Sequence, residues 1–66
     1  MSIAKTIEIV AESTVNWEDA AKLALKEASK TVKNISGIWI KDMKAIVENN
    51  QITRYRVNCK ITFIIK

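Results

Sequence analysis

The chain has 66 residues, of which 48% are apolar, and its formal net charge at pH 7 is +4. It contains no histidine and a single cysteine, Cys59, which excludes Ser-His-Asp and Cys-His catalytic arrangements and a disulfide within the chain. No apolar stretch approaches the ~20 residues that span a bilayer, so we expect one small intracellular domain, residues 1–66, in the cytoplasm. So short a chain buries little apolar surface alone, which favours association with further copies.

The first half of the chain predicts a strand and then a helix. Residues 3–11 alternate between apolar and more polar side chains, the period of a strand. Asn16 is the expected N-cap, and Glu18 and Asp19 follow in the first turn, where carboxylates meet the positive end of the helix dipole. We expect the helix to end at Asn34 or Gly37, which both tolerate positive φ. Its apolar stripe comprises Trp17, Ala20, Ala21, Ala24, Ala28, Val32 and Ile35.

The second half predicts two long strands joined by a hairpin. The alternation that starts at Ile38 changes phase near Lys41 and Asp42, which indicates a β-bulge. Asn49 and Asn50 suit the positive φ of a tight turn. The last strand then alternates regularly up to Phe63, after which Ile64 breaks the pattern. The predicted fold is therefore α+β, in the order β-α-β-β, with a three-stranded antiparallel sheet packed on one helix.

The two faces of the last strand predict different environments. Its odd-numbered face is apolar and is expected against the helix, which makes Cys59 a buried packing residue rather than a reactive thiol. Trp17, on the apolar side of the helix, is assigned to the same core. Trp39 falls on the opposite, polar face of the sheet, where an indole needs a partner. Trp39 is the first residue that points to a binding function.

Charge is distributed unevenly along the sequence. Residues 1–29 hold three lysines against five acidic residues, a net charge of −2, whereas the remainder holds eight Lys or Arg against two acidic residues, a net charge of +6. A basic half attracts nucleic acid in some proteins, but a solvated basic surface is the commoner meaning. With four aromatic residues and no basic run interleaved with them, we do not favour nucleic acid as the partner.

Four runs, spread over nearly the whole chain, resemble the dodecin family. They are Glu12-Ser13-Thr14, Trp17-Glu18-Asp19-Ala20-Ala21, Ala28-Ser29-Lys30-Thr31-Val32 and Tyr55-Arg56-Val57-Asn58-Cys59-Lys60-Ile61-Thr62-Phe63. The resemblance implies a hollow homo-oligomer, a dodecamer. It also implies that the oligomer binds flavin, as FMN or riboflavin, in pairs at two-fold contacts, and stores or shields this ligand without turning over a substrate.

The resemblance also implies where the ligand binds. In flavin-binding members a Trp early in the second strand stacks on the isoalloxazine, and a Gln in the third strand hydrogen-bonds its edge. Here these positions fall on Gly37 and Arg56. Trp39 lies on the same strand face as Gly37, about 7 Å further along, and offers a ring in place of the family's Trp. Arg56 offers its fork of N–H donors to a flavin carbonyl or phosphate. With Asp42, these residues form the candidate flavin site.

Two alternatives remain open at this stage. In the first, Trp39 and Arg56 pack against each other or against a neighbouring subunit, as cation–π or interface contacts. In the second, the protein is a dodecin-like structural assembly without flavin that binds an ion such as calcium through carboxylates brought together at subunit contacts. No EF-hand pattern or other metal motif identifies the ligands of such an ion.

Overall fold

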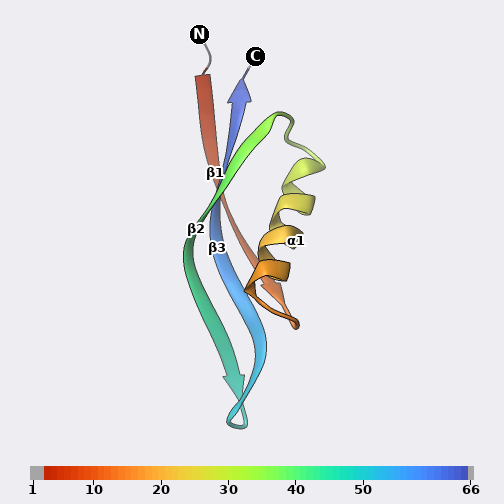
Figure 1. Ribbon diagram of the computed structural model, residues 1–66, viewed down its shortest axis with the longest axis vertical. Helices are drawn as coiled ribbons and strands as arrows, with labels where there is room; N and C mark the ends of the chain where they lie inside the picture. Colours follow the sequence, from red (N-terminus) through yellow and green to blue (C-terminus); the bar gives the residue numbers. More distant parts are fainter. Residues whose placement is uncertain (1–2, 66) are drawn as a thin grey trace.

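The computed structural model describes residues 3–65 as one sheet and one helix (Figure 1). The elements are β1 (Ile3–Ser13), α1 (Trp17–Ser29), β2 (Ile35–Glu48) and β3 (Gln51–Ile65). The sheet is antiparallel and has the order β1-β3-β2. This confirms the predicted α+β fold and its β-α-β-β order. No helix among the described residues is long and apolar enough to cross a membrane.

Helix α1 begins at the predicted cap. The Asn16 side chain accepts a hydrogen bond from the backbone N–H of Asp19, with an N···O distance of 2.7 Å. Ser13 at the end of β1 donates its hydroxyl to Asp19 Oδ2 at 2.6 Å and accepts a bond from the backbone N–H of Val15. These bonds satisfy donors that a helix N-terminus otherwise leaves unpaired, and they fix the short connection from β1 into α1.

The prediction that the helix extends to Asn34 or Gly37 is wrong. The helix ends at Ser29, and Lys30 is its C-cap. Asn34 has a positive φ of 63°, but it turns the chain into β2, and its carbonyl accepts a bond from the backbone N–H of Ile64 at 3.0 Å. Gly37 lies inside β2 and has no positive φ. Strand β2 starts at Ile35, which pairs with Phe63 of β3. This pairing uses the backbone N–H and C=O groups that a longer helix would need.

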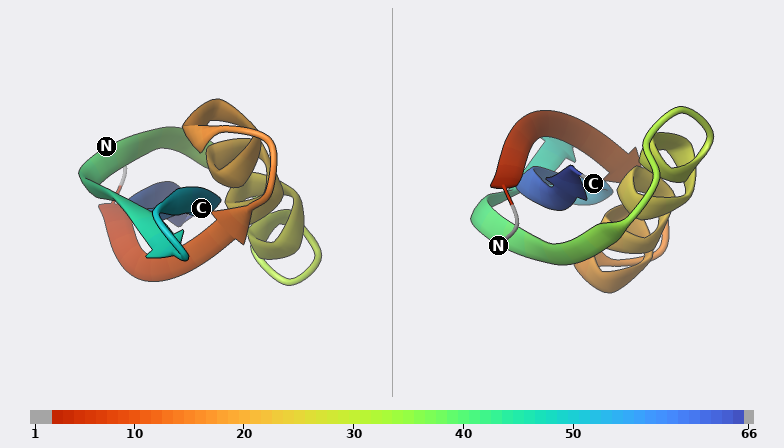
Figure 2. Two further views of the ribbon diagram at one scale, coloured as in Figure 1. Left: turned by 90° about the horizontal axis from the view of Figure 1, so that it is seen from below. Right: turned by 90° about the horizontal axis from the view of Figure 1, so that it is seen from above.

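The core lies between α1 and the central strand β3. Ala20, Ala24 and Ala28 are the fully buried residues of the helix, and they face the buried side chains of β3, namely Val57, Cys59 and Ile61. This confirms the assignment of Cys59 to the core, where burial raises the pKa of its thiol and keeps it protonated. The helix packs chiefly against β1 and β3, on one side of the three strands (Figure 2).

Trp17 closes one end of this core, as predicted. Its side chain packs against the buried cluster around Ala20 and Cys59, and its ring meets that of Tyr55 edge-on, with centroids 5.0 Å apart. Its Nε1–H donates to the backbone carbonyl of Lys44 at 3.3 Å. The indole therefore contributes both apolar area and a hydrogen bond that links α1 to β2.

Strands β2 and β3 form the hairpin that the sequence predicts, and the hairpin extends beyond the helix (Figure 1). Asn49 and Asn50 have φ values of 52° and 61°, the pair of positive values that a type I′ turn requires. In β2, Ile40 pairs with Cys59 but Asp42 pairs with Asn58, so one extra residue forms the predicted bulge. The projecting hairpin makes the molecule elongated, with extents of 51 × 19 × 13 Å.

We predict that Leu in place of Ala24 or Ala28 destabilises the protein. These alanines are 1% and 4% exposed, so a larger side chain forces α1 away from β3, and overpacking of this kind costs about 1–3 kcal/mol. Urea denaturation measures the effect. Lys26→Leu, at an exposed position of the same helix, is the control and should change the free energy of unfolding far less. Equal stability of all three variants and the wild type would contradict this packing.

Candidate functional site

The candidate site lies on the open face, which we define as the side of the sheet turned away from α1. The register places all four sequence-predicted residues there. Gly37 pairs with Thr62, Trp39 with Lys60, and Asp42 with Asn58, while Arg56 lies between Lys44 of β2 and Glu12 of β1. These partners alternate in β3 with the buried core residues, so they point away from the helix.

Trp39 presents an exposed ring on the open face. Its side chain is 62% exposed, and the ammonium group of Lys60 lies 5.2 Å from the ring centroid, a cation–π contact. The cation over Trp39 within the chain is therefore Lys60 and not Arg56, while the packing of either residue against a neighbouring subunit stays a prediction. The register explains this, because Lys60 is the residue directly opposite Trp39.

Arg56 is instead held by Glu12. Its Nε donates to Glu12 Oε2 at 2.6 Å, and its Nη2 forms an ion pair with the same oxygen. Arg54, two residues earlier on the same strand face, donates to Glu12 Oε1 at 3.2 Å and to Glu48 Oε1 at 3.4 Å. The hydrogen bond from Arg56 is the main cause that lowers the pKa of Glu12. This network orients the guanidinium of Arg56 on the sheet.

These ion pairs account for the uneven charge of the sequence. The acidic residues of β1 lie beside the basic residues of β3, and Glu8 lies within 4.0 Å of the amino groups of both Lys41 and Lys60. Each basic residue of β3 from Arg54 to Lys60 thus has a carboxylate within 4.0 Å. Arg54, Arg56 and Lys60 therefore lie beside carboxylates and do not form a run of unpaired positive charge, while the chain as a whole keeps a net charge of +4.

A small pocket lies on the open face. The pocket has a volume of 240 Å³ and is lined by Val10, Asp42, Met43, Lys44, Arg56 and Asn58. Asn58 Oδ1 is itself closed off from solvent and, among residues 3–65, accepts no hydrogen bond. A buried acceptor without a partner costs about 1–3 kcal/mol. The structure therefore brings Asp42 and Arg56 together in one pocket, whereas Gly37 and Trp39 lie further along the same face.

The sequence interpretation placed Asn58 and Val10 on the polar sides of their strands but did not include them, or Glu12, in the candidate site. Strict alternation in the last strand was the available signal for Asn58, because it puts this residue on the same side as Arg56. The signal for Glu12 was weaker. It lay in the excess of acidic residues in the first half of the chain and of basic residues in the second half. This excess predicts ion pairs between the two halves but does not say which residues form them.

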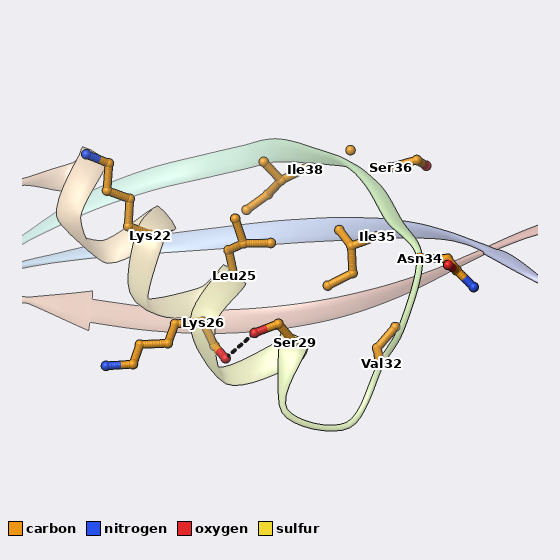
Figure 3. A pocket seen from close by; sticks show the side chains of 10 residues that line it. Lys22, Leu25, Lys26, Ser29, Val32, Asn34, Ile35, Ser36 and Ile38 are labelled. Carbon is orange, nitrogen blue, oxygen red and sulfur yellow. Dashed lines mark hydrogen bonds between the residues drawn. The ribbon is translucent and has the colours of Figure 1, made fainter.

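A second concave surface lies between α1 and the start of β2. This groove has a volume of 640 Å³, and Figure 3 shows Leu25, Ile35 and Ile38 gathered along it, while the amino groups of Lys22 and Lys26 point away. The groove exists because the helix lies over β1 and β3 and leaves β2 poorly covered. It is an apolar surface that lacks the convergent polar groups of a specific ligand site.

The described residues contain no preformed metal site. Within residues 3–65, no three His, Cys, Asp or Glu side chains come close enough together to hold an ion. A calcium ion, as in the structural alternative, would therefore need carboxylates from more than one chain. The chemistry that the open face does supply is an exposed ring beside the amino group of Lys60, a guanidinium held by Glu12 and the carboxylate and amino groups of Asp42 and Lys44.

We predict that Glu12 makes stability depend on pH in the acid range. Its pKa is lower in the folded chain than in the unfolded chain, so the carboxylate stabilises the fold above its unfolded pKa of about 4.3. This contribution is lost as the pH falls through the folded pKa. Thermal unfolding between about pH 7 and about pH 3 should show a smaller loss of stability for Glu12→Gln than for the wild type.

Glu18→Gln is the matched control for this experiment. Glu18 lies on the exposed surface of α1, 3.9 Å from the amino group of Lys22, and its replacement should change the acid profile of the wild type less than the replacement of Glu12 does. If Glu12→Gln and the wild type lose stability in parallel, the network of Glu12 with Arg54 and Arg56 does not contribute to the acid sensitivity of the protein.

Comparison with solved structures supports the fold assignment. An arginine-to-alanine variant of Thermus thermophilus dodecin superposes with a TM-score of 0.94 at 23% identity, covering 100% of this chain and 98% of that chain. A dodecin from Streptomyces davaonensis gives 0.92 at 20% identity, covering 98% and 96%, and one from Streptomyces coelicolor gives 0.93 at 20% identity, covering 98% and 93%.

Comparison of sequences places the chain in a family. No curated protein sequence matches it closely enough to count as a relative. The model of the Dodecin family, in contrast, matches residues 3–66, which is nearly the whole chain and includes every element described above. The chain therefore belongs to the dodecin family.

Proposed function

We propose that this protein is a non-enzymatic, homo-oligomeric flavin-binding protein that stores or shields FMN or riboflavin. The observation that carries this proposal is the indole of Trp39, which is 62% exposed on an otherwise polar face near a pocket that contains Arg56 and Asn58. An exposed indole beside hydrogen-bonding groups can stack on a flat aromatic ligand while the polar groups contact its edge.

The residues of the open face fit a flavin, although the family's Trp and Gln positions are occupied by Gly37 and Arg56. A Cβ atom added at Gly37 would meet nothing within 4 Å, so the strand face next to Trp39 is open. Trp39 would hold the isoalloxazine by stacking, and Arg56 would place a positive charge near its carbonyl groups or phosphate. When bound, a flavin supplies redox and light-absorbing chemistry, and the role of these residues is to bind it and limit its access to water.

Homo-oligomerisation is supported by the amount of apolar surface that one chain leaves uncovered. Among the described residues, six apolar residues are buried, and three of them are alanines. The large apolar side chains that remain at least 38% exposed are Ile3, Val10, Val15, Leu23, Leu25, Ile38, Trp39, Met43, Val47, Ile52 and Ile65. They include residues of the groove between α1 and β2 and of the projecting hairpin. Surfaces of this kind become buried when copies associate.

We predict that the purified protein is an oligomer much larger than a dimer, and a dodecamer if it assembles like the family's hollow shell. The chain mass is 7.5 kDa, so multi-angle light scattering separates a monomer from a shell of many chains without ambiguity. A measured mass near that of one chain at micromolar concentration would contradict the oligomer and remove the shielded space in which a ligand is stored.

We predict that free riboflavin loses most of its fluorescence when it is titrated with this protein, because an indole stacked on the excited ring quenches it by electron transfer. Trp39→Ala should weaken binding by about 1–3 kcal/mol, the contribution of one aromatic stacking contact. Trp39→Phe keeps an aromatic ring at the same place and is the matched control, which should retain more of the affinity than the alanine variant.

Gly37→Trp provides a test in the opposite direction. This substitution restores the family residue on the same strand face, and the open space around Gly37 accommodates it, so flavin binding should tighten. The measured mass of each variant should match that of the wild type. If the wild type and all three variants leave riboflavin fluorescence unchanged, flavin is not the ligand of the open face, and an assembly without flavin becomes the better account.

A further inference from the structure

We propose that the end of the β2–β3 hairpin of one copy docks into the groove between α1 and β2 of another copy. The hairpin end is defined here as residues 45–52, which contain the Asn49-Asn50 turn. The inference rests on the homo-oligomer of the proposed function and deepens it, because it assigns the surfaces through which the copies meet. Each copy then contributes one hairpin end and receives one.

The groove combines an apolar floor with a basic rim. Leu25 and Ile38 of the floor are each 38% exposed. Among the residues 3–65 that line the groove, the charged ones are Lys22 and Lys26, and both are positive. Their amino groups point away from the floor (Figure 3), at the end of flexible stems that can turn toward a carboxylate. A matching partner therefore has apolar side chains for the floor and a negative charge for the rim.

The hairpin end carries this combination. Val47 and Ile52 form a cross-strand pair and are 60% and 53% exposed, so two aliphatic side chains project together. Glu48 is the only charged residue of the hairpin end. The hydrogen bonds that it accepts, from Thr53 and Arg54, go to Oε1, and within residues 3–65 its Oε2 accepts none. An exposed carboxylate oxygen thus lies beside the exposed apolar pair.

The hairpin end cannot fill the groove of its own chain. Figure 1 shows that the hairpin projects past the N-terminal end of α1. The groove lies beside the C-terminal half of the helix, where Leu25 and Ser29 line it. The two surfaces therefore lie toward opposite ends of a molecule that is 51 Å long, and the hairpin that enters the groove comes from another copy.

Other exposed apolar residues fit the groove less well. Ile3 and Ile65 also form an exposed cross-strand pair, but residues 1–7 contain Lys5 and no acidic residue, so the basic rim repels this end of the sheet. Leu23 is exposed on α1. A helix is about 10–12 Å wide, however, and enters a groove less deeply than a hairpin with strands about 4.8 Å apart.

The turn of the hairpin also suits the β2 side of the groove. Strand β2 is at the edge of the sheet, so the backbone groups along its outer side have no strand partner within residues 3–65. Asn34 and Ser36 add polar side chains at its start. The turn residues Asn49 and Asn50 bring two carboxamides, each of which donates and accepts hydrogen bonds. Docking therefore supplies partners to the polar part of the groove as well as to its apolar floor.

Charge reversal tests the docking. Glu48→Lys and Lys22→Glu, each alone, place like charges in the contact, so the urea concentration at which the oligomer dissociates, followed by light scattering, should fall. Both substitutions in one chain restore opposite charges and should return this concentration toward the wild-type value. Glu27→Lys reverses an exposed charge of α1 outside the groove and the hairpin end. It is the matched control and should dissociate as the wild type does.

Cysteine pairs test the contact directly. In the variant Leu25→Cys with Ile52→Cys, docking brings sulfur atoms of two copies within reach of a disulfide. Treatment with oxidised glutathione should therefore link chains into covalent dimers and larger products on a denaturing gel without reductant. The native Cys59 is buried and does not compete. Leu23→Cys with Ile52→Cys, in which the helix position is exposed but outside the groove, is the matched control and should link far fewer chains.

Each outcome bears on one statement. Recovery in the double reversal supports docking, because loss of the contact between Glu48 and Arg54 within one hairpin would not be repaired by a change on α1. An oligomer that neither single reversal weakens, or an intact oligomer without links between Leu25→Cys and Ile52→Cys, overturns docking and leaves the proposed homo-oligomer standing. A monomeric wild type overturns both. If Glu48→Lys does not fold, the cysteine pairs, which keep Glu48, decide the question.

Discussion

The pairing of β3 with β1 along one edge and with β2 along the other is the constraint on which the rest of the structure depends. Because side chains alternate along a strand, this one segment supplies both the core and the candidate site. Val57, Cys59 and Ile61 are buried under the helix, while Arg56 and Asn58 point to the open face. A register shift of one residue would exchange these two sets and remove the core and the site together.

The open face combines ion pairs across the sheet with an exposed indole. Glu12 pairs with both arginines of β3, so these arginines are fixed by the protein before any ligand arrives. A fixed guanidinium loses less freedom on binding than a mobile one, but part of its hydrogen-bonding capacity is already used.

The single chain leaves many large apolar side chains exposed. The alanines of α1 permit close packing on β3, but small side chains bury little apolar area, and the helix leaves β2 largely uncovered. The apolar groove beside α1 and the hairpin that projects beyond it are consequences of this geometry. Association with further copies of the chain, as proposed above, would cover these surfaces.

The sequence by itself determined the local features of this protein, because they depend on near neighbours in the chain. Asn16 caps the helix, Asn49 and Asn50 make the turn, and the phase change at Lys41 marks the bulge. These features, together with the alternation of the last strand, were enough to predict the fold and the face on which Trp39 lies. The same reasoning failed at the end of the helix, because the pairing of Ile35 with Phe63 is a long-range competitor that helix periodicity cannot reveal.

Only the tertiary structure decided which side chains meet across the sheet. The contact of Lys60 with Trp39, the capture of Arg56 by Glu12 and the unpaired oxygen of Asn58 all depend on the register of three strands that are far apart in the sequence. Residue type and spacing place each of these side chains on a face, but the hydrogen-bonding state of a group is set by the atoms that fold against it. For that reason the sequence placed Trp39 and Arg56 on the open face, and the fold decided which side chains they meet there.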